Sequence, residues 1–231
     1  MTRTFVILLA LVAGWIDAAS FVGLHHIMAA HITGNLVILA ADIATGFHET
    51  DLLKIFILPI FFVAVMAVTL VHDRYVAVHD DSARHIRGML AIEAALIAAT
   101  GAIGVLASLK GWALDFWLAL VIATPVTIAM ALQNALHRLY PIVGPATTVM
   151  TGNITQFFMD RTRGMTGRAS RSLINDMPKD NSLLPVLILA FGLGCLLGAA
   201  TTTQVGNSAF LIPAALILVA AASTRKGAKA T

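Results

Sequence analysis

Two copies of the tripeptide Thr-Gly-Asn interrupt apolar stretches of this chain, at Thr33-Gly34-Asn35 and at Thr151-Gly152-Asn153. Threonine is a favourable helix N-cap, glycine lets a solute approach the backbone closely, and the asparagine amide both donates and accepts hydrogen bonds. The free amides and positive dipole end of a helix that starts there favour an anion or the oxygen-rich edge of a neutral molecule. These residues predict a solute-binding site. The alternative interpretation is that they only cap helices and pack the two parts of the chain together.

Asp17 is the most deeply placed acid in the sequence, because it lies well inside the apolar run from 4 to 24. A charge near the centre of a bilayer costs at least ~2.5 kcal/mol on insertion scales, so this carboxylate should face protein or water rather than lipid. Asp17 is therefore our candidate for coupling proton movement to function. With a one-residue gap allowed, Gln133 and Asn134 hold the position of Ile16 and Asp17 ahead of the second tripeptide, and we add them to the predicted binding residues.

Four further ionisable residues are secondary candidates. His31 lies two residues before the first tripeptide and could relay a proton or contact solute. Asp42 and Asp160 each follow the asparagine of their tripeptide by seven positions, where a carboxylate either ends in water or meets a cation as a gate contact. Glu93 lies one turn into another apolar stretch, where it could pair with Arg87 or reach outward.

The sequence offers no pattern for metal, cofactor or enzyme chemistry. His25, His26 and His31 are close in the chain, but spacing places no further histidine, cysteine or carboxylate cluster near them. Cys195 is the only cysteine, which excludes an internal disulfide. No phosphate loop, nucleophile elbow or pair of catalytic carboxylates is evident. We predict no metal, no cofactor and no enzymatic activity.

Composition places these residues in a membrane, since 58% of the chain is apolar and 12% is charged, against roughly 45–50% and 25% in soluble proteins. We predict an all-α integral membrane protein with six full spans, each near the ~20 residues that cross a bilayer. The apolar windows are 4–24, 52–72, 88–108, 115–137, 183–205 and 207–223.

The tripeptides fall in two additional, interrupted segments, 25–46 and 141–164. In each, we expect an extended stretch to lead to the threonine N-cap and then to an apolar helix of about three turns. Such a helix would start within the membrane, where non-helical backbone survives only if it is buried in protein or lines a wet cavity. The site is therefore predicted between the parts of the chain that carry the two half-helices.

An internal repeat relates the two interrupted segments. Shifting the sequence by 118 positions, 151 minus 33, superposes the tripeptides, Asp42 on Asp160 and Gly46 on Gly164. We predict two homologous halves, 1–109 and 110–231, which form one integrated membrane domain.

The fifteen lysine and arginine residues bear on orientation, because positively charged loops stay cytoplasmic. If the interrupted segments enter and leave on one face, only Lys54 and Lys110 lie outside, and 15 minus 2, or 13, basic residues lie inside. If those segments cross fully, eight spans leave 11 inside. We favour the six-span arrangement with inverted halves. Both arrangements place the N- and C-termini in the cytoplasm.

The sequence resembles a known family at several of these positions. Gly14-Trp15-Ile16-Asp17, Gln133-Asn134-Ala135 and Thr147-Thr148, together with the two tripeptides, are similar to the paired signatures of the YoaK-like family of bacterial inner-membrane proteins. The resemblance covers almost the whole chain. It implies a polytopic protein of the bacterial inner membrane with six spans, and it supplies no substrate or reaction.

The residues together predict a small-solute transporter, with proton coupling through Asp17 as the mechanism to test. A passive channel and a non-transporting membrane scaffold or partner subunit are the alternatives. The expected partners are an unidentified small solute and the lipid bilayer, and a homo-oligomer stays open. The basic segment 161–171 is short and lacks interleaved aromatic residues, so no nucleic-acid partner is predicted.

Overall fold

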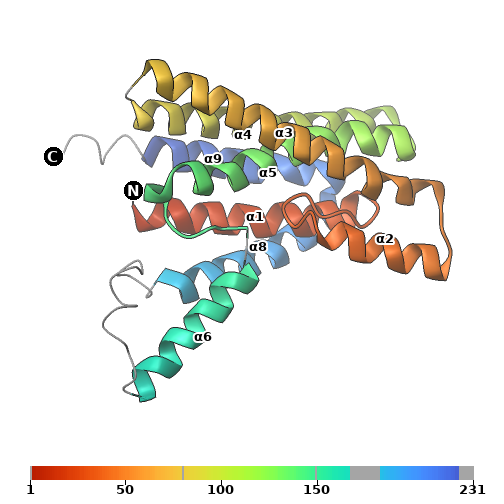
Figure 1. The fold of residues 1–231 in the computed structure, drawn as a ribbon. Helices are drawn as coiled ribbons and strands as arrows, with labels where there is room; N and C mark the ends of the chain where they lie inside the picture. Colours follow the sequence, from red (N-terminus) through yellow and green to blue (C-terminus); the bar gives the residue numbers. More distant parts are fainter. Residues whose placement is uncertain (1, 80, 149, 167–182, 224–231) are drawn as a thin grey trace.

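The computed structural model describes residues 2–79, 81–148, 150–166 and 183–223, and their regular elements are all helices. Figure 1 shows how these helices are arranged. The elements are α1 (Arg3–Gly23), α2 (Gly34–Thr45), η1 (Glu49–Asp51), α3 (Leu52–Val78), α4 (Ser82–Lys110), α5 (Phe116–Leu139), η2 (Pro141–Val143), α6 (Met150–Thr166), α8 (Leu183–Val205), η3 (Gly206–Phe210) and α9 (Leu211–Ser223).

Five helical segments in the described ranges are long and apolar enough to cross a membrane. They are Arg3–Gly23, Glu49–Val78, Ser82–Lys110, Phe116–Leu139 and Leu183–Ala222. The last of these contains two of the six expected spans, 183–205 and 207–223, because α8, η3 and α9 follow one another without a loop. The turn between α8 and α9 is made at Gly206, whose φ of 61° is a left-handed conformation that glycine adopts at little cost.

The long helices pack into one bundle around α1. Helix α1 contacts α8, α9, η3 and α5, while α5 packs against α3 and α4. Helix α4 packs against α9 and η3, and the shorter helices α2 and α6 pack against α3 and α8 respectively. In Figure 1, α1, α5, α8 and α9 lie side by side, and α6 diverges from them. The residues that surround α1 therefore form the interior of the molecule.

The outer surface of the bundle is apolar. On α3, large side chains on one face are more than half exposed, including Phe62, Val63, Met66 and Leu70. A patch of this kind on a protein in water would promote association, whereas lipid tails solvate it without cost. The exposed apolar surface therefore agrees with a bilayer as the surrounding solvent.

Small residues bring the backbones of α1 and α8 into direct contact. A β-carbon added to Gly194 would collide with the carbonyl of Leu11, and one added to Gly198 would collide with the carbonyl of Trp15. Gly14 of α1 faces the carbonyl of Phe191 in the same way. Since Gly194 and Gly198 are four residues apart, they lie on one face of α8. This close approach positions α8 beside the part of α1 that carries Asp17.

The chain reverses direction after α1. His25 and His26 have φ values of 49° and 62°, so they form a left-handed turn instead of the extended stretch expected from 25 onward. The amide of His26 donates to the carbonyl of Phe21 at 3.1 Å, which closes the end of α1. Non-glycine residues are strained in this conformation by roughly 1 kcal/mol each. The turn sends residues 27–33 back along α1, and α2 starts from there.

Candidate functional site

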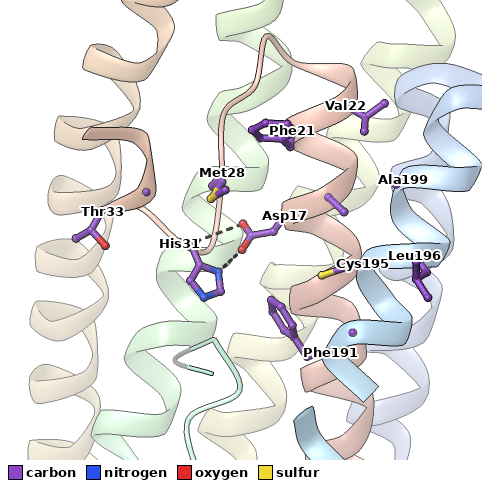
Figure 2. Close-up of a pocket in the computed structure, with 13 residues that line it drawn as sticks. Asp17, Phe21, Val22, Met28, His31, Thr33, Phe191, Cys195, Leu196 and Ala199 are labelled. Carbon is purple, nitrogen blue, oxygen red and sulfur yellow. Dashed lines mark hydrogen bonds and ion pairs between the residues drawn. The ribbon is translucent and has the colours of Figure 1, made fainter. Parts of the chain in front are cut away.

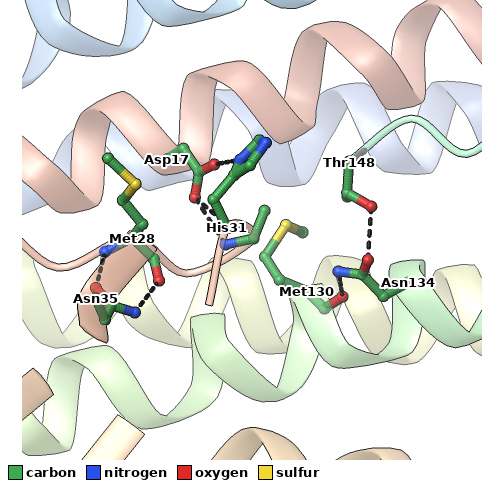
Figure 3. Close-up of polar contacts among 8 residues, drawn as sticks. Asp17, Met28, His31, Asn35, Met130, Asn134 and Thr148 are labelled. Atoms are coloured by element: carbon green, nitrogen blue, oxygen red, sulfur yellow. Dashed lines mark hydrogen bonds and ion pairs between the residues drawn. The ribbon is translucent and has the colours of Figure 1, made fainter. Parts of the chain in front are cut away.

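Asp17 and His31 form a buried pair where the returning segment meets α1 (Figure 3). One carboxylate oxygen of Asp17 accepts hydrogen bonds from the amides of Ala30, at 2.7 Å, and His31, at 3.3 Å. The other oxygen contacts Nδ1 of the His31 ring. Asp17 is only 6% exposed, so these three donors replace the water that the carboxylate would otherwise need. Asp17 therefore faces protein, as its position in the sequence indicated.

The His31 ring is suited to exchanging a proton. Because Nδ1 points at the Asp17 carboxylate, we assign the Nδ1 proton to that contact, which leaves Nε2 as the second titrating atom. Nε2 has no hydrogen-bond partner among the described residues, and 34% of the His31 side chain is exposed. Nε2 accepts a hydrogen bond when the ring is neutral and donates one when it is protonated.

The pair lies in the wall of a cavity of about 680 Å3 between α1, the returning segment and α8 (Figure 2). Thr33 and Gly34 of the first tripeptide also line it. The cavity thus brings together four residues that the sequence predicted as candidate site residues: Asp17, His31, Thr33 and Gly34. Its other lining residues are mainly apolar or carry sulfur: Ala18, Phe21, Val22, Met28, Phe191, Gly192, Cys195, Leu196 and Ala199.

The side chain of the asparagine in each tripeptide is hydrogen-bonded to the backbone of the segment that precedes its helix. Asn35 is fully buried, and its amide donates to the carbonyl of Met28 at 2.8 Å and accepts from the Met28 amide at 2.7 Å. Asn153 donates to the carbonyl of Ala146 at 2.7 Å. Both bonds span seven residues. The predicted contact of Asn35 with solute is replaced here by a bond to the backbone, so Asn35 supports the wall of the cavity without lining it.

The start of α2 differs from the expected anion site. The amides of Gly34, Asn35 and Leu36 donate to the carbonyls of His31, Ile32 and Thr33, at 2.9, 3.2 and 3.2 Å. Three of the amides that were predicted to be free are therefore used, because a tight turn with i to i−3 bonds leads into the helix.

The threonines of the tripeptides also depart from their predicted capping role. Thr33 occupies the N-cap position but has helical backbone angles and makes no side-chain cap bond. Thr151 lies within α6, one residue after Met150, so it is not the N-cap either. Thr33 contributes to the cavity as one of its lining residues.

The second tripeptide and its neighbours do not line this cavity. Gln133 donates to the carbonyl of Leu9 at 2.9 Å and to the Thr147 hydroxyl at 2.8 Å. Asn134 accepts from the Thr148 hydroxyl at 2.6 Å (Figure 3). Gln133 and Asn134 therefore hold the segment before α6 against α5, as Asp17 holds the segment before α2 against α1. Thr151, Gly152 and Asn153 follow at the start of α6.

His137 is a polar neighbour that the sequence analysis did not single out. Its Nε2 lies 2.8 Å from the Thr147 hydroxyl, which also accepts from Gln133. The only available signal was its position four residues after Gln133, on the same face of α5.

The remaining secondary candidates lie away from the cavity. Nζ of Lys54 is 2.9 Å from Asp42 and 2.8 Å from Asp51, and the Lys54 side chain is fully buried. In the sequence, Lys54 was considered only for the orientation of the chain in the membrane. In the structure, Lys54 is the cation that pairs with Asp42. On α6, Asp160 accepts from Gln156 at 2.8 Å and lies 3.8 Å from Arg163.

Glu93 is buried in α4, at 1% exposure, without lining the cavity. Its Oε1 has no hydrogen-bond partner within the described part of the chain. The expected pairing with Arg87 is not among the ion pairs of these residues. Across the described ranges, no group of three or more histidine, cysteine or carboxylate residues is arranged to hold a metal ion.

The amide bridge of Asn35 supports a stability prediction. Asn35→Ala should lower the free energy of unfolding by roughly 1–3 kcal/mol, because it leaves the amide and carbonyl of Met28 buried without partners. Thr33→Ala is the matched control and should change stability by less than about 0.5 kcal/mol, since Thr33 is exposed and makes no cap bond. Thermal unfolding in detergent measures both variants. Equal stability of the two would contradict the role of Asn35.

The long apolar helices fit a multi-pass membrane protein, and Asp17 is a buried carboxylate among them. The chain belongs to the DUF1275 family, described as proteins of unknown function, and the family model matches residues 5–223. No curated protein and no solved structure matches it. The family match covers all of the helices described above except the first two residues of α1, so the cavity lies within the family region.

Proposed function

We propose that this protein is a small-solute transporter and that the cavity beside α1 is its binding site. The observation that carries the proposal is the Asp17–His31 pair in the wall of a cavity of about 680 Å3 among apolar helices. A carboxylate within a membrane is costly to keep, and such residues usually mark solute pathways or proton relays. Asp17 is the proton-coupling residue in this proposal, with His31 as the group that exchanges the proton with the cavity.

The path of the backbone supports a transport site. Residues 24–33 are not helical, and they separate α1 from α2 within the wall of the cavity. Interrupted backbone at membrane depth is tolerated where it lines a water-filled cavity, and interrupted helices commonly form the sites of secondary transporters. A passive channel could use the same elements but would not need Asp17 to titrate. A scaffold would need neither the cavity nor the ionisable pair.

Two inverted halves, 1–109 and 110–231, are part of the proposal. The helix contacts support it, because exchanging α1 with α5, α2 with α6, α3 with α8 and α4 with α9 converts the observed packing pairs into one another. Thus α1–α8 corresponds to α3–α5, α1–α9 to α4–α5, and α2–α3 to α6–α8. Helices α2 and α6 also run toward opposite ends of the bundle (Figure 1). Six spans with two re-entrant half-helices, one from each face, account for this pattern.

We place the protein in a bacterial inner membrane, following the resemblance of its motifs, with both termini in the cytoplasm. The start of α1 and the end of α9 lie at the same end of the bundle, which supports a common side for the termini (Figure 1). The distribution of basic residues assigns that side to the cytoplasm. Self-association into a homo-oligomer is compatible with the apolar outer face.

Orientation is testable at Glu49, which is exposed in the turn between α2 and α3. In a Cys195→Ala background, Glu49→Cys should react with a membrane-impermeant maleimide added outside intact cells. The physical reason is that the re-entrant path of residues 24–45 returns the chain to the outer face. Ser82→Cys, at the start of α4 just beyond the other end of α3, is the matched control and should react only after the cells are opened. Labelling of Glu49→Cys only in opened cells would reject this topology.

Transport is tested directly in proteoliposomes that contain the purified protein and a pH-sensitive dye. A panel of neutral, anionic and cationic solutes is added outside, and movement of solute and protons is compared with protein-free liposomes. At least one solute class should move in a protein-dependent and saturable way, and its uptake should move protons. Uptake without proton movement would favour the channel. If no solute in the panel moves, the scaffold replaces the transporter as the function.

A further inference from the structure

The charges that face the cavity are few. Among the described residues, Asp17 and His31 are the only ones in its lining with a carboxylate or an imidazole, Cys195 adds a thiol, and no lysine or arginine takes part. Helix α8 contributes no charged residue between 183 and 205. Of the other titratable groups on the surrounding elements, His25 and His26 lie in the turn outside the lining, and Asp42 of α2 pairs with Lys54. The net charge of the cavity is therefore set by the Asp17–His31 pair.

The net charge of the Asp17–His31 pair depends on whether His31 is protonated. Three hydrogen-bond donors point at the two oxygens of Asp17, which is the arrangement that accommodates a carboxylate. When His31 carries a proton on both ring nitrogens, the pair is neutral overall. When Nε2 loses its proton, one uncompensated negative charge stays in an apolar, partly desolvated space. Such a charge strongly favours a cation nearby, because Coulomb attraction increases as the effective dielectric constant falls.

We propose that the solute is a hydrophobic organic cation and that it exchanges for a proton. This inference rests on the proposed transport function and names the solute class of the same site. The cation binds when Nε2 of His31 is deprotonated, and the released proton passes from that N–H to water. One positive charge enters the cavity as another leaves it. Proton and solute are therefore mutually exclusive, which is the thermodynamic requirement for exchange.

The apolar lining fits the body of such a solute. The rings of Phe21 and Phe191 can face a cation with their π-electrons, and the Phe191 ring already lies 5.5 Å from the His31 ring, centroid to centroid. Met28 and Cys195 add polarizable sulfur atoms. Figure 2 shows these side chains around Asp17 and His31. A sugar or other polyol would leave most of its hydroxyl groups without partners against this surface, whereas an apolar cation would not.

The test uses the purified full-length protein in lipid nanodiscs and two ions of the same shape and opposite charge, tetraphenylphosphonium and tetraphenylborate. Saturable binding is measured above that of empty nanodiscs at about pH 5.5 and about pH 8.5, on either side of the usual histidine range. We expect phosphonium to bind about tenfold more tightly at the higher pH, to release about one proton for each ion bound at the lower pH and almost none at the higher pH, and borate to show no saturable binding.

Two variants separate the site from general partitioning into lipid. Asp17→Asn removes the negative charge and should lose saturable phosphonium binding. Glu93→Gln makes the same carboxyl-to-amide change at another buried acid that does not line the cavity, and it should bind as the unmodified protein does. Thermal unfolding of both variants establishes that they are folded. If Asp17→Asn does not fold, His31→Gln replaces it and should remove the pH dependence between these two values.

The outcomes distinguish this inference from the transport proposal. Equal binding of borate, phosphonium binding that does not change with pH, unchanged binding by folded Asp17→Asn, or no saturable binding at all would overturn the cation assignment. If proteoliposomes take up a neutral or anionic solute, the transporter stands and its solute class is different. If phosphonium binds with proton release but no solute crosses the membrane, the cation site stands and transport is rejected.

Discussion

Asp17→Asn should strongly reduce solute uptake driven by a pH gradient while leaving the protein folded. Asparagine keeps the shape of the side chain, and its oxygen can still accept from the amides of Ala30 and His31. It carries no charge, however, so it can no longer stabilise a proton on the His31 ring. Loss of one charge-assisted hydrogen bond is worth roughly 1.5–3 kcal/mol, which corresponds to about ten- to a hundredfold in the gradient-driven rate.

The measurement compares gradient-driven flux in proteoliposomes with thermal stability in detergent. Glu93→Gln is the matched control, because Glu93 is also a buried acid in a long apolar helix but lies outside the cavity. We expect near-normal flux from that variant. Unchanged gradient-driven uptake by Asp17→Asn would remove Asp17 from the coupling mechanism. Unfolding of Asp17→Asn together with normal flux from the fraction that stays folded would assign the residue a structural role.

Gly194→Ala should prevent α8 from packing on α1. The added methyl group would collide with the carbonyl of Leu11, and neither that carbonyl nor the α-carbon that carries the methyl group can move without its helix. Relief requires the helices to separate along their whole contact, which includes Gly14 and Gly198. We expect a loss of about 3 kcal/mol or more in stability, at the upper end of overpacking effects. The expected observation is aggregated or poorly expressed protein.

Gly192→Ala is the control for this experiment, because it makes the same substitution two residues earlier on the same helix. Nothing lies within 4 Å of a β-carbon at Gly192. Alanine is also the better helix former by about 1 kcal/mol, so this variant should be at least as stable as the unmodified protein. Size-exclusion chromatography and thermal unfolding in detergent compare the two. Similar stability of Gly194→Ala and Gly192→Ala would contradict the close contact between α1 and α8.

The first half of the site was predictable to a large extent from residue types. Asp17 stands out because a carboxylate inside an apolar run needs a partner, and the tripeptide at 33–35 interrupts the next apolar run. Its Thr33 and Gly34 do line the cavity with Asp17. Asn35 was predicted to bind solute because its amide has a donor and an acceptor. In the structure, both groups are hydrogen-bonded to the backbone of Met28. A side-chain amide can form the same hydrogen bonds with buried backbone groups as with a ligand. The sequence does not distinguish these two partners.

Composition and the spacing of polar residues determined that this chain has long apolar helices of the kind that can cross a membrane, where those helices lie, and that Asp17 is buried among them. These properties are local, since about twenty consecutive apolar residues suffice to define a spanning helix. Only the tertiary structure decided that His31 is the partner of Asp17, that Lys54 is buried between Asp42 and Asp51, and that α8 completes the cavity. Each of these contacts depends on the left-handed turn at 25–26, on the return of the chain after α2, or on glycine contacts between helices far apart in sequence. They arise from packing in three dimensions, which no short window of the sequence specifies.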